Sequence, residues 1–174
     1  YAQRAAELQR NFGSISWGIG TVRQLEHAEL KVNVGKSFRM PSAKELASNG
    51  VNYHMYRYEQ GDSTLMAEES YQLDLGVDYQ RLGWDVSLSP FLNYFPNYIY
   101  LNPSATYTHA QQVFHYSQSE VFRTGAELFV SYRFSDAVRV SYDAEYVYSL
   151  QLSGEKKGYT LPFSPPLTSF VELA

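Results

Sequence analysis

Alternation of apolar and polar residues is the main pattern along this chain. Between residues 71 and 80, aromatic and aliphatic side chains occupy every second position, and polar residues or glycine lie between them. A period of two is typical of a β-strand with one apolar face. The same alternation recurs at 30–34, 122–134 and 138–148, more weakly at 12–20 and 84–95, and a further strand is expected near Leu167. The sequence therefore predicts an all-β chain of about seven or eight strands.

The length of these strands and the residues at their ends indicate which class of β protein the chain belongs to. The alternating segments run for about 9–13 residues, whereas strands of soluble proteins have a mode near 5–6 and transmembrane strands need about 9–11. Aromatic residues bracket the apolar face, as Tyr71 and Tyr79 do in one strand and Phe122 and Phe134 in another. Aromatic girdles and a polar opposite face are features of outer-membrane barrels. This pattern predicts an antiparallel up-and-down transmembrane β-barrel segment.

The lengths of the predicted connections independently indicate a transmembrane barrel. The predicted connections are alternately short, near 21–28, 80–83 and 135–137, and long, at about 39–69, 102–119 and 151–165. Transmembrane barrels have short periplasmic turns and longer extracellular loops, so they produce this alternation. A soluble β-sandwich or a small soluble barrel that binds a ligand remains the alternative.

Helix is expected only after Pro41. Ser42 is placed to cap a short helix over 42–47, and Glu45, three residues later, completes a capping box. Arg39 directly precedes this segment, and we expect it to pair with a loop or lumen carboxylate such as Glu45. Pro41 lacks an amide hydrogen and cannot continue a central strand.

Composition and charge exclude several classes. The chain has 174 residues, a formal net charge of −4 and no cysteine, so it offers no disulfide, no thiolate metal site and no basic surface for nucleic acid. No run approaches the roughly 18 apolar residues of a transmembrane helix. The 16 tyrosines suit surfaces that are apolar at one end and wet at the other. The chain starts at Tyr1 without a methionine and stops inside a predicted strand, so we expect a piece of a longer protein.

One predicted loop concentrates residues suited to ligand binding. Three tyrosines, a histidine and an arginine fall within seven residues, namely Tyr53, His54, Tyr56, Arg57 and Tyr58. Tyrosine gives flat contact area at low entropy cost, and arginine binds carboxylates and aromatic faces. These five are the candidate ligand-binding residues, in what we expect to be an extracellular loop. A loop that only packs against itself is the alternative.

Enzyme chemistry is not indicated. The sequence has no His-Glu-x-x-His zinc motif, no glycine-rich phosphate loop and no nucleophile elbow, so we expect neither an enzyme nor a resident cofactor or metal. Carboxylates and arginines share the polar faces of the strands, and we expect them to form a cross-strand charge ladder. The carboxylates are Asp74, Asp78, Glu127, Asp143 and Glu145, and the arginines are Arg123, Arg133 and Arg139.

A run of short motifs resembles the barrel of TonB-dependent outer-membrane receptors. The first is a strand that ends in Phe38-Arg39-x-Pro41 and leads to Glu45-Leu46. Further motifs follow in the family's order over residues 12–172, at 49–50, 57–68, 91–103, 114–116, 125–127 and 161–166. The resemblance implies a barrel of roughly 22 strands in the bacterial outer membrane, filled by an N-terminal plug domain. It also implies import of a scarce small molecule, such as an iron–siderophore, haem or cobalamin, with energy relayed by the TonB complex through the plug.

The resemblance also implies a specific role for His54. Haem receptors of this family carry a ligating histidine between a Phe-Arg-Ala-Pro box and an Asn-Pro-Asn-Leu box. His54 lies between Phe38-Arg39-Met40-Pro41 and Gly61-Asp62-Ser63-Thr64-Leu65, with Met40 in place of alanine and a second box that departs from the pattern. Imidazole ligates haem iron, so axial ligation by His54 is a hypothesis that the resemblance implies.

Overall fold

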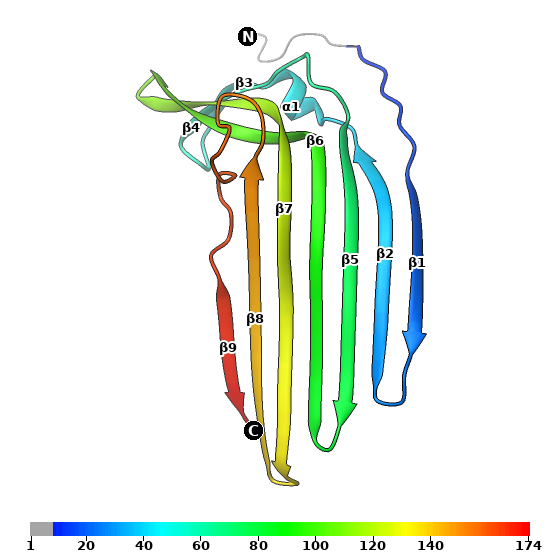
Figure 1. Ribbon diagram of the computed structural model, residues 1–174. Coiled ribbons are helices and arrows are strands. Elements are labelled where there is room, and N and C mark those ends of the chain that lie inside the picture. The colour runs from blue at the N-terminus through cyan, green and yellow to red at the C-terminus, as the bar shows by residue number, and fades with distance from the viewer. Residues whose placement is uncertain (1–8) are drawn as a thin grey trace.

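A single long-stranded sheet dominates the computed structural model, which describes residues 9–174. Seven strands form an antiparallel up-and-down meander (Figure 1): β1 (Trp17–Gln24), β2 (Ala28–Arg39), β5 (Glu68–Arg81), β6 (Trp84–Thr108), β7 (Gln111–Ser135), β8 (Val138–Gln151) and β9 (Thr168–Leu173). The predicted fold class, including the strand near Leu167, is confirmed. At one end of the sheet the strands are joined by tight turns, as predicted.

The opposite end carries a smaller substructure. The connection between β2 and β5 contains α1 (Ala43–Ala47) and the hairpin of β3 (Asn49–Asn52) and β4 (Arg57–Gln60). Strand β4 pairs in parallel with residues 113–115 of β7, the one parallel pairing among the described strands. We call α1, β3, β4 and the outer parts of β6 and β7, residues 98–108 and 111–119, the cap.

One predicted connection is wrong, and another is shorter than predicted. Residues 102–119 form no loop, because β6 continues to Thr108 and β7 restarts at Gln111 after a two-residue turn. His109 and Ala110 form that turn with φ angles of 51° and 61°, a conformation usually taken by glycine or asparagine, so the sequence carries no turn signal there. Strand β1 also starts later than predicted and extends to Gln24, which shortens the first connection to 25–27.

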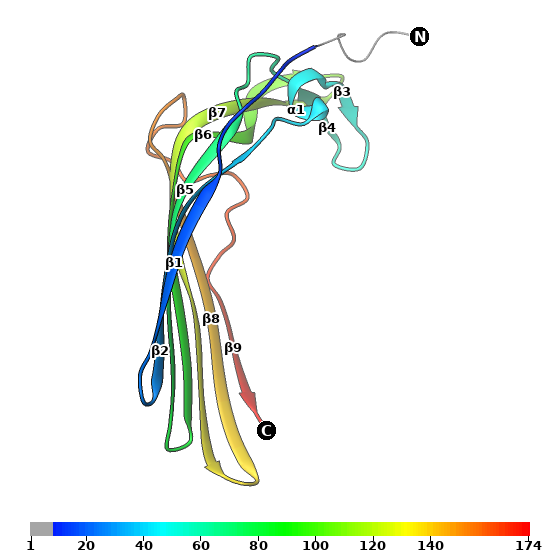
Figure 2. The ribbon, with the colours of Figure 1, turned by 90° about the vertical axis from the view of Figure 1, so that its right-hand side faces the viewer.

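The cap bends away from the plane of the sheet. The pairing of β6 with β7 shifts register between Phe95 and Tyr98, around Pro96 and Asn97. Proline cannot donate to the ladder and an extra residue bends a strand, so this bulge is the physical cause of the bend. Figure 2 shows the cap lying over the concave side of the curved sheet. The cap therefore covers one end of that side.

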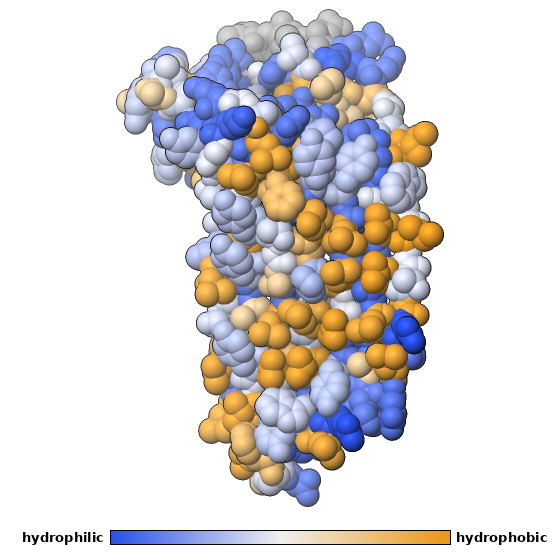
Figure 3. Space-filling view, viewed as in Figure 1, coloured by the Kyte–Doolittle hydropathy of each residue, from blue (hydrophilic) through white to orange (hydrophobic). Residues whose placement is uncertain are grey.

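Apolar side chains cover the convex face of the sheet. Cross-strand pairing aligns Ile19, Val34, Leu73 and Leu92 in one row, and their neighbours two residues away form further apolar rows. Figure 3 shows apolar residues gathered over the middle of the face. Of the four in the aligned row, Ile19, Val34 and Leu92 are exposed. Within residues 9–174 no second sheet packs on this face, so the structure does not have the two layers of a β-sandwich.

Aromatic residues border this apolar face at both ends. Trp17, Tyr71, Tyr94 and Phe122 fall in register near the bend. Near the tight turns, Trp84 contacts Tyr132 and Tyr132 contacts Phe134, with ring centroids 4.6 and 4.7 Å apart. The predicted aromatic brackets of the strands are confirmed. Among the described residues, no helix has the length and apolar character to cross a membrane.

The polar face departs from the predicted charge ladder. Asp78 pairs with Lys31, with 2.9 Å between Oδ2 and Nζ. The arginines of that ladder form no ion pair within the described part of the chain, and Glu127 lies opposite Glu145. The ladder of carboxylates and arginines is therefore wrong, because same-sign residues come into register across β7 and β8.

Two small cores hold the bend in place. Phe95, Tyr100, Val121 and Leu161 form one cluster, and Leu46, Leu65 and Ile99 form the other. Ile99 and Tyr100 are adjacent on β6, so their side chains point to opposite faces. Each face of the bent strand thus has its own buried cluster, one reaching α1 and the other reaching the β8–β9 connection.

Candidate functional site

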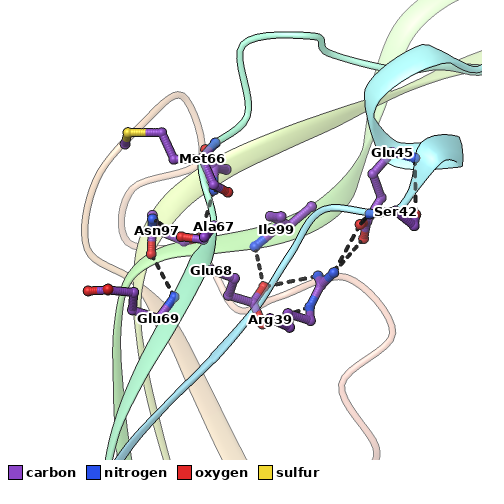
Figure 4. A network of polar contacts seen from close by, with 10 residues as sticks. Arg39, Ser42, Glu45, Met66, Ala67, Glu68, Glu69, Asn97 and Ile99 are labelled. Carbon is purple, nitrogen blue, oxygen red and sulfur yellow. Dashed lines mark hydrogen bonds and ion pairs between the residues drawn. The ribbon is translucent and has the colours of Figure 1, made fainter. Parts of the chain in front are cut away.

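Arg39 clamps the end of β2 to the cap. Its Nε and Nη2 donate to the two carboxylate oxygens of Glu68, each over 3.0 Å, and its Nη1 lies 2.9 Å from Oε2 of Glu45 (Figure 4). The predicted pair with Glu45 is confirmed, and Glu68 is a second partner that the sequence did not indicate. Burial of the guanidinium acts to lower the pKa of Arg39, but its two carboxylate partners raise it above its ordinary value. The fork geometry of arginine suits this double contact.

The capping box at α1 is formed as predicted. The Ser42 amide donates to Oε2 of Glu45 over 2.7 Å, and the Glu45 amide donates to Oγ of Ser42 over 3.2 Å. Burial acts to raise the pKa of Glu45, whereas Arg39 and the Ser42 amide lower it below its ordinary value. Pro41 is buried directly before Ser42, the N-cap residue of α1, and Leu46 is buried in the core beneath α1. The family motif residues from Phe38 to Leu46 therefore build the junction between β2 and the cap.

Hydrogen bonds join the start of β5 to the bulge in β6. Glu68 accepts from the Ile99 amide over 2.6 Å, in addition to its two bonds from Arg39. Asn97 donates to the Ala67 carbonyl over 2.5 Å and accepts from the Glu69 amide over 3.0 Å (Figure 4). These bonds satisfy the polar groups freed by the bulge and fix the angle of the cap.

A second charge cluster lies inside the cap. Glu59 is only 2% exposed and accepts from Lys44, Arg57 and Asn52 over 2.6, 2.8 and 2.9 Å. Burial acts to raise the pKa of Glu59, but these donors lower it below its ordinary value. Arg57 also lies over the ring of Phe114, 5.0 Å from its centroid. The cluster joins α1, β3 and β4 to β7.

The five candidate ligand-binding residues divide into two groups. Tyr53, His54 and Tyr56 lie at the exposed turn between β3 and β4, and the His54 amide donates to the side-chain oxygen of Asn52. Arg57 is engaged with Glu59, and the Tyr58 hydroxyl donates to Asn49 over 2.8 Å. The structure does not gather all five around one cavity. Their role in ligand binding and the haem role of His54 stay predictions.

A cavity that the sequence did not indicate lies beneath the cap. It has a volume of about 690 Å³ and is bounded by β6 at Asn102 and Pro103 and by the β8–β9 connection, residues 152–167. That connection crosses the polar face of the sheet, since Oγ of Ser149 accepts from the Leu161 amide and bonds to Ser164. Sequence reasoning missed the cavity because its walls come from residues about 50 positions apart and from an extension interpreted as a loop.

The match to protein families decides the class of this chain. A model described as "TonB dependent receptor-like, beta-barrel" matches residues 2–173. The chain belongs to the TonB-dependent receptor β-barrel family. The fold class and the resemblance inferred from the motifs are confirmed.

Solved structures of TonB-dependent receptors have the same fold. The copper transporter OprC superposes with a TM-score of 0.74 at 19% identity over 90% of this chain and 23% of OprC. The siderophore receptor PirA from Pseudomonas aeruginosa gives 0.64 at 20% identity over 81% of this chain and 29% of PirA. The ferric enterobactin receptor PfeA from Pseudomonas aeruginosa gives 0.63 at 20% identity over 91% of this chain and 25% of PfeA. This chain of a TonB-dependent receptor barrel thus spans about a quarter of the length of the solved relatives.

Proposed function

We propose that this chain is a wall segment of an outer-membrane TonB-dependent receptor that imports a scarce small molecule of the iron–siderophore, haem or cobalamin class. The chain contributes barrel strands, and its cap belongs to the extracellular end. Its role is that of a transporter component and not of an enzyme. The family assignment and the receptor fold of the neighbouring structures support this function.

The uncovered apolar face is the observation that carries the proposal. Tyr71 and Tyr79 border it on β5 and are eight residues apart, roughly 26 Å at about 3.3 Å per strand residue. The apolar band of an outer-membrane barrel is about 25 Å tall and is edged by aromatic girdles. A lipid bilayer therefore fits the width, the chemistry and the borders of this face, with the polar concave face turned to the barrel interior.

The proposal includes partners that act on the whole receptor. Residues 1–174 form part of one barrel domain, which encloses a plug domain through which the TonB complex acts. The lipid partner is the bacterial outer membrane, and the cargo is a small molecule, with no nucleic acid involved. The cap lies at the end opposite the tight turns, as expected for extracellular loops.

Growth of a strain lacking the receptor gene tests the proposal. The strain is supplied with one iron source or one corrinoid at a time: ferric enterobactin, haem or cyanocobalamin. We expect one source to fail, and to be restored by the gene only when TonB is present. Normal growth on every source, or restoration without TonB, would contradict import by this receptor.

The haem hypothesis has its own test. His54→Ala in the receptor should abolish haem binding if the imidazole is an axial ligand, and absorption spectra of the reconstituted protein report the ligation state. Unchanged haem affinity would remove His54 from the site. Arg57 holds Glu59, so a variant of Arg57 would also disturb the cap. The matched control is His109→Ala, the same change at an exposed histidine in the β6–β7 turn.

A further inference from the structure

The cap ends in a strand whose outer edge is free. Within residues 9–174, β3 pairs with β4 alone, so it is the last strand of the cap sheet, in which β6, β7, β4 and β3 follow one another. A free edge presents unpaired amides and carbonyls, and it is a template for pairing with another strand.

The backbone groups on this edge belong to two residues. The Gly61 amide donates to the Ser48 carbonyl over 2.7 Å, so these two residues form a hydrogen-bonded pair just before β3. Hydrogen-bonded pairs alternate with unbonded pairs along an antiparallel ladder. Counted from Ser48, every second residue therefore bonds to β4, and the amides and carbonyls of Asn49 and Val51 point to the free edge.

The two edges of the cap sheet differ in their protection. On the β6 edge, Pro103 has no amide hydrogen, and the pairing with β7 shifts register between Pro103 and Tyr107. Proline and bulges both protect an edge from further pairing. The four residues of β3 are asparagine, glycine, valine and asparagine, without proline or charge, and they pair with β4 in regular register. The β3 edge is therefore the one that accepts a further strand.

A cavity lies along the same edge. It has a volume of about 310 Å³ and is lined by all four residues of β3, by Lys44 and Ser48 of the α1 end, and by Glu59. A Cβ atom at Gly50 would meet nothing within 4 Å, so this glycine leaves room beside the strand. The edge thus combines unpaired backbone groups with space for the side chains of an added strand, which is the arrangement used in β-strand addition.

The charges at the cavity indicate an acidic partner. Among the described residues, Glu59 is the one carboxylate that pairs with Lys44 and Arg57, so the three groups together carry one positive charge. The Lys44 side chain is 52% exposed and that of Glu59 only 3%, so a partner at the edge meets the cation. Pairing with a second copy would bring a second Lys44 to the same edge, and like charges across an interface oppose association.

The position of the edge indicates where the partner strand comes from. Figure 2 shows the β3–β4 hairpin at the end of the cap, over the concave side of the sheet. In the proposed barrel this side is the interior, so the free edge faces the extracellular mouth. The chain spans about a quarter of the length of the solved relatives, so a receptor of that length has further loops at this end.

We infer that the β3 edge pairs with an extended acidic segment from another extracellular loop of the same receptor, which joins the cap sheet as a fifth strand. Asn49 and Val51 exchange backbone hydrogen bonds with this segment, and one of its carboxylates pairs with Lys44. The inference rests on the proposed receptor function and adds to it a contact that ties the cap to the far side of the mouth.

Hydrogen exchange of the intact receptor in lipid vesicles, with no other protein added, tests the inference. The amides of Gly50 and Asn52 bond to β4, whereas those of Asn49 and Val51 have no partner in the cap. We expect all four to exchange slowly when exchange is resolved to single residues. Exchange at Asn49 and Val51 as fast as in the exposed turn at 53–56 would overturn the inference.

Val51→Pro removes an outward amide without removing a bond to β4. It should raise the exchange rate at Asn49 at least tenfold while Gly50 and Asn52 stay protected. Val51→Thr is the matched control, because it keeps the amide and the β-branched shape, and it should leave exchange at Asn49 unchanged. An equal response at Asn49 in the two variants would contradict the pairing.

Crosslinking identifies the partner in a receptor whose β3 backbone is unchanged. The chain has no cysteine, so Asn49→Cys carries a benzophenone maleimide at the free edge, and Tyr107→Cys on the opposite edge is the matched control. We expect Asn49→Cys alone to crosslink within one receptor chain, to a loop segment that contains aspartate or glutamate.

Three crosslinking results would overturn the inference: no crosslink, a crosslink to a second copy or to another protein, or the same crosslink from both positions. The growth test separates the two proposals. TonB-dependent uptake of one source, together with fast exchange at Asn49 and Val51, leaves the receptor function standing and removes only the added strand.

Discussion

At the residue scale, only glycine fits at position 61, because the backbone at the end of α1 lies directly against it. A Cβ atom added there would lie 2.7 Å from the Ala47 amide nitrogen and 2.8 Å from backbone atoms of Leu46 and Ser48. Backbone atoms cannot move aside as a flexible side chain can, so Gly61→Ala should destabilise the cap by about 1–3 kcal/mol. Gly50→Ala is the control, because a Cβ at Gly50 meets nothing within 4 Å. Thermal unfolding of the two variants measures the difference, and equal midpoints would contradict the packing argument.

Glu59 makes the cap sensitive to acid. Its pKa in the folded protein lies below the ordinary value of 4.5, so its ion pairs contribute stability above that pH. This contribution is lost as the pH falls through the lower folded-state pKa, when the carboxylate becomes protonated. The chain has no cysteine, so Met55→Cys introduces a single spin label at the β3–β4 turn. The label should become mobile on acidification below pH 4.5.

Glu59→Gln removes the titrating group and is the control for that experiment. The label in this variant should be mobile already at neutral pH and show little further change on acidification. A label that responds to acid equally in both proteins would assign the response to another group.

At the scale of elements, the clamp by Arg39 holds the cap on the sheet. Arg39→Ala leaves Glu68 and Glu45 without their shared cation, and Arg39→Lys keeps the charge but loses the fork. Because the guanidinium is partly exposed, we expect Arg39→Ala to lower the free energy of unfolding of the cap by about 1–2 kcal/mol. Hydrogen exchange of the α1 amides should rise roughly 5–30-fold, the equivalent of that loss. Exchange within residues 72–79 of β5 should not change.

Arg139→Lys is the matched control for the clamp, since Arg139 lies on β8 and forms no ion pair in residues 9–174. Its exchange pattern should equal that of the unchanged protein. Equal protection of α1 in Arg39→Ala and Arg139→Lys would show that the clamp contributes nothing to cap stability.

Local patterns predicted most elements, and non-local contacts account for the errors. Alternation placed the meander strands and the capping box placed α1, because both depend on neighbours within a few residues. The outer hairpin of β6 and β7 escaped prediction, since Pro96 interrupts the pattern and its turn at His109 lacks favoured turn residues. The parallel pairing of β4 with β7 joins residues over 50 positions apart, which no local signal encodes.

The same distinction holds for the candidate site. The motif from Phe38 to Leu46 predicted the pairing of Arg39 with Glu45, because the partners are six residues apart. The cavity at Asn102 needed the bend in β6 and the crossing of the β8–β9 connection, and both arise from tertiary packing. The segment Tyr98–Asn102 contains two tyrosines and an isoleucine, which favour a strand and would place Asn102 in the sheet.

At the scale of the whole molecule, the two faces of the sheet should respond oppositely to charge. Leu75 lies midway between Tyr71 and Tyr79 on the convex apolar face, and the neighbouring Asp74 faces the concave side. If the convex face meets lipid, Leu75→Arg places a cation near the bilayer midplane and costs about 2–4 kcal/mol. Asp74→Arg changes a wetted face and should cost far less. In water, an arginine at the half-exposed position 75 would stay within roughly 0.5 kcal/mol. Urea unfolding of the receptor in lipid vesicles measures both variants, and a cost for Leu75→Arg no larger than that for Asp74→Arg would contradict the lipid-facing assignment.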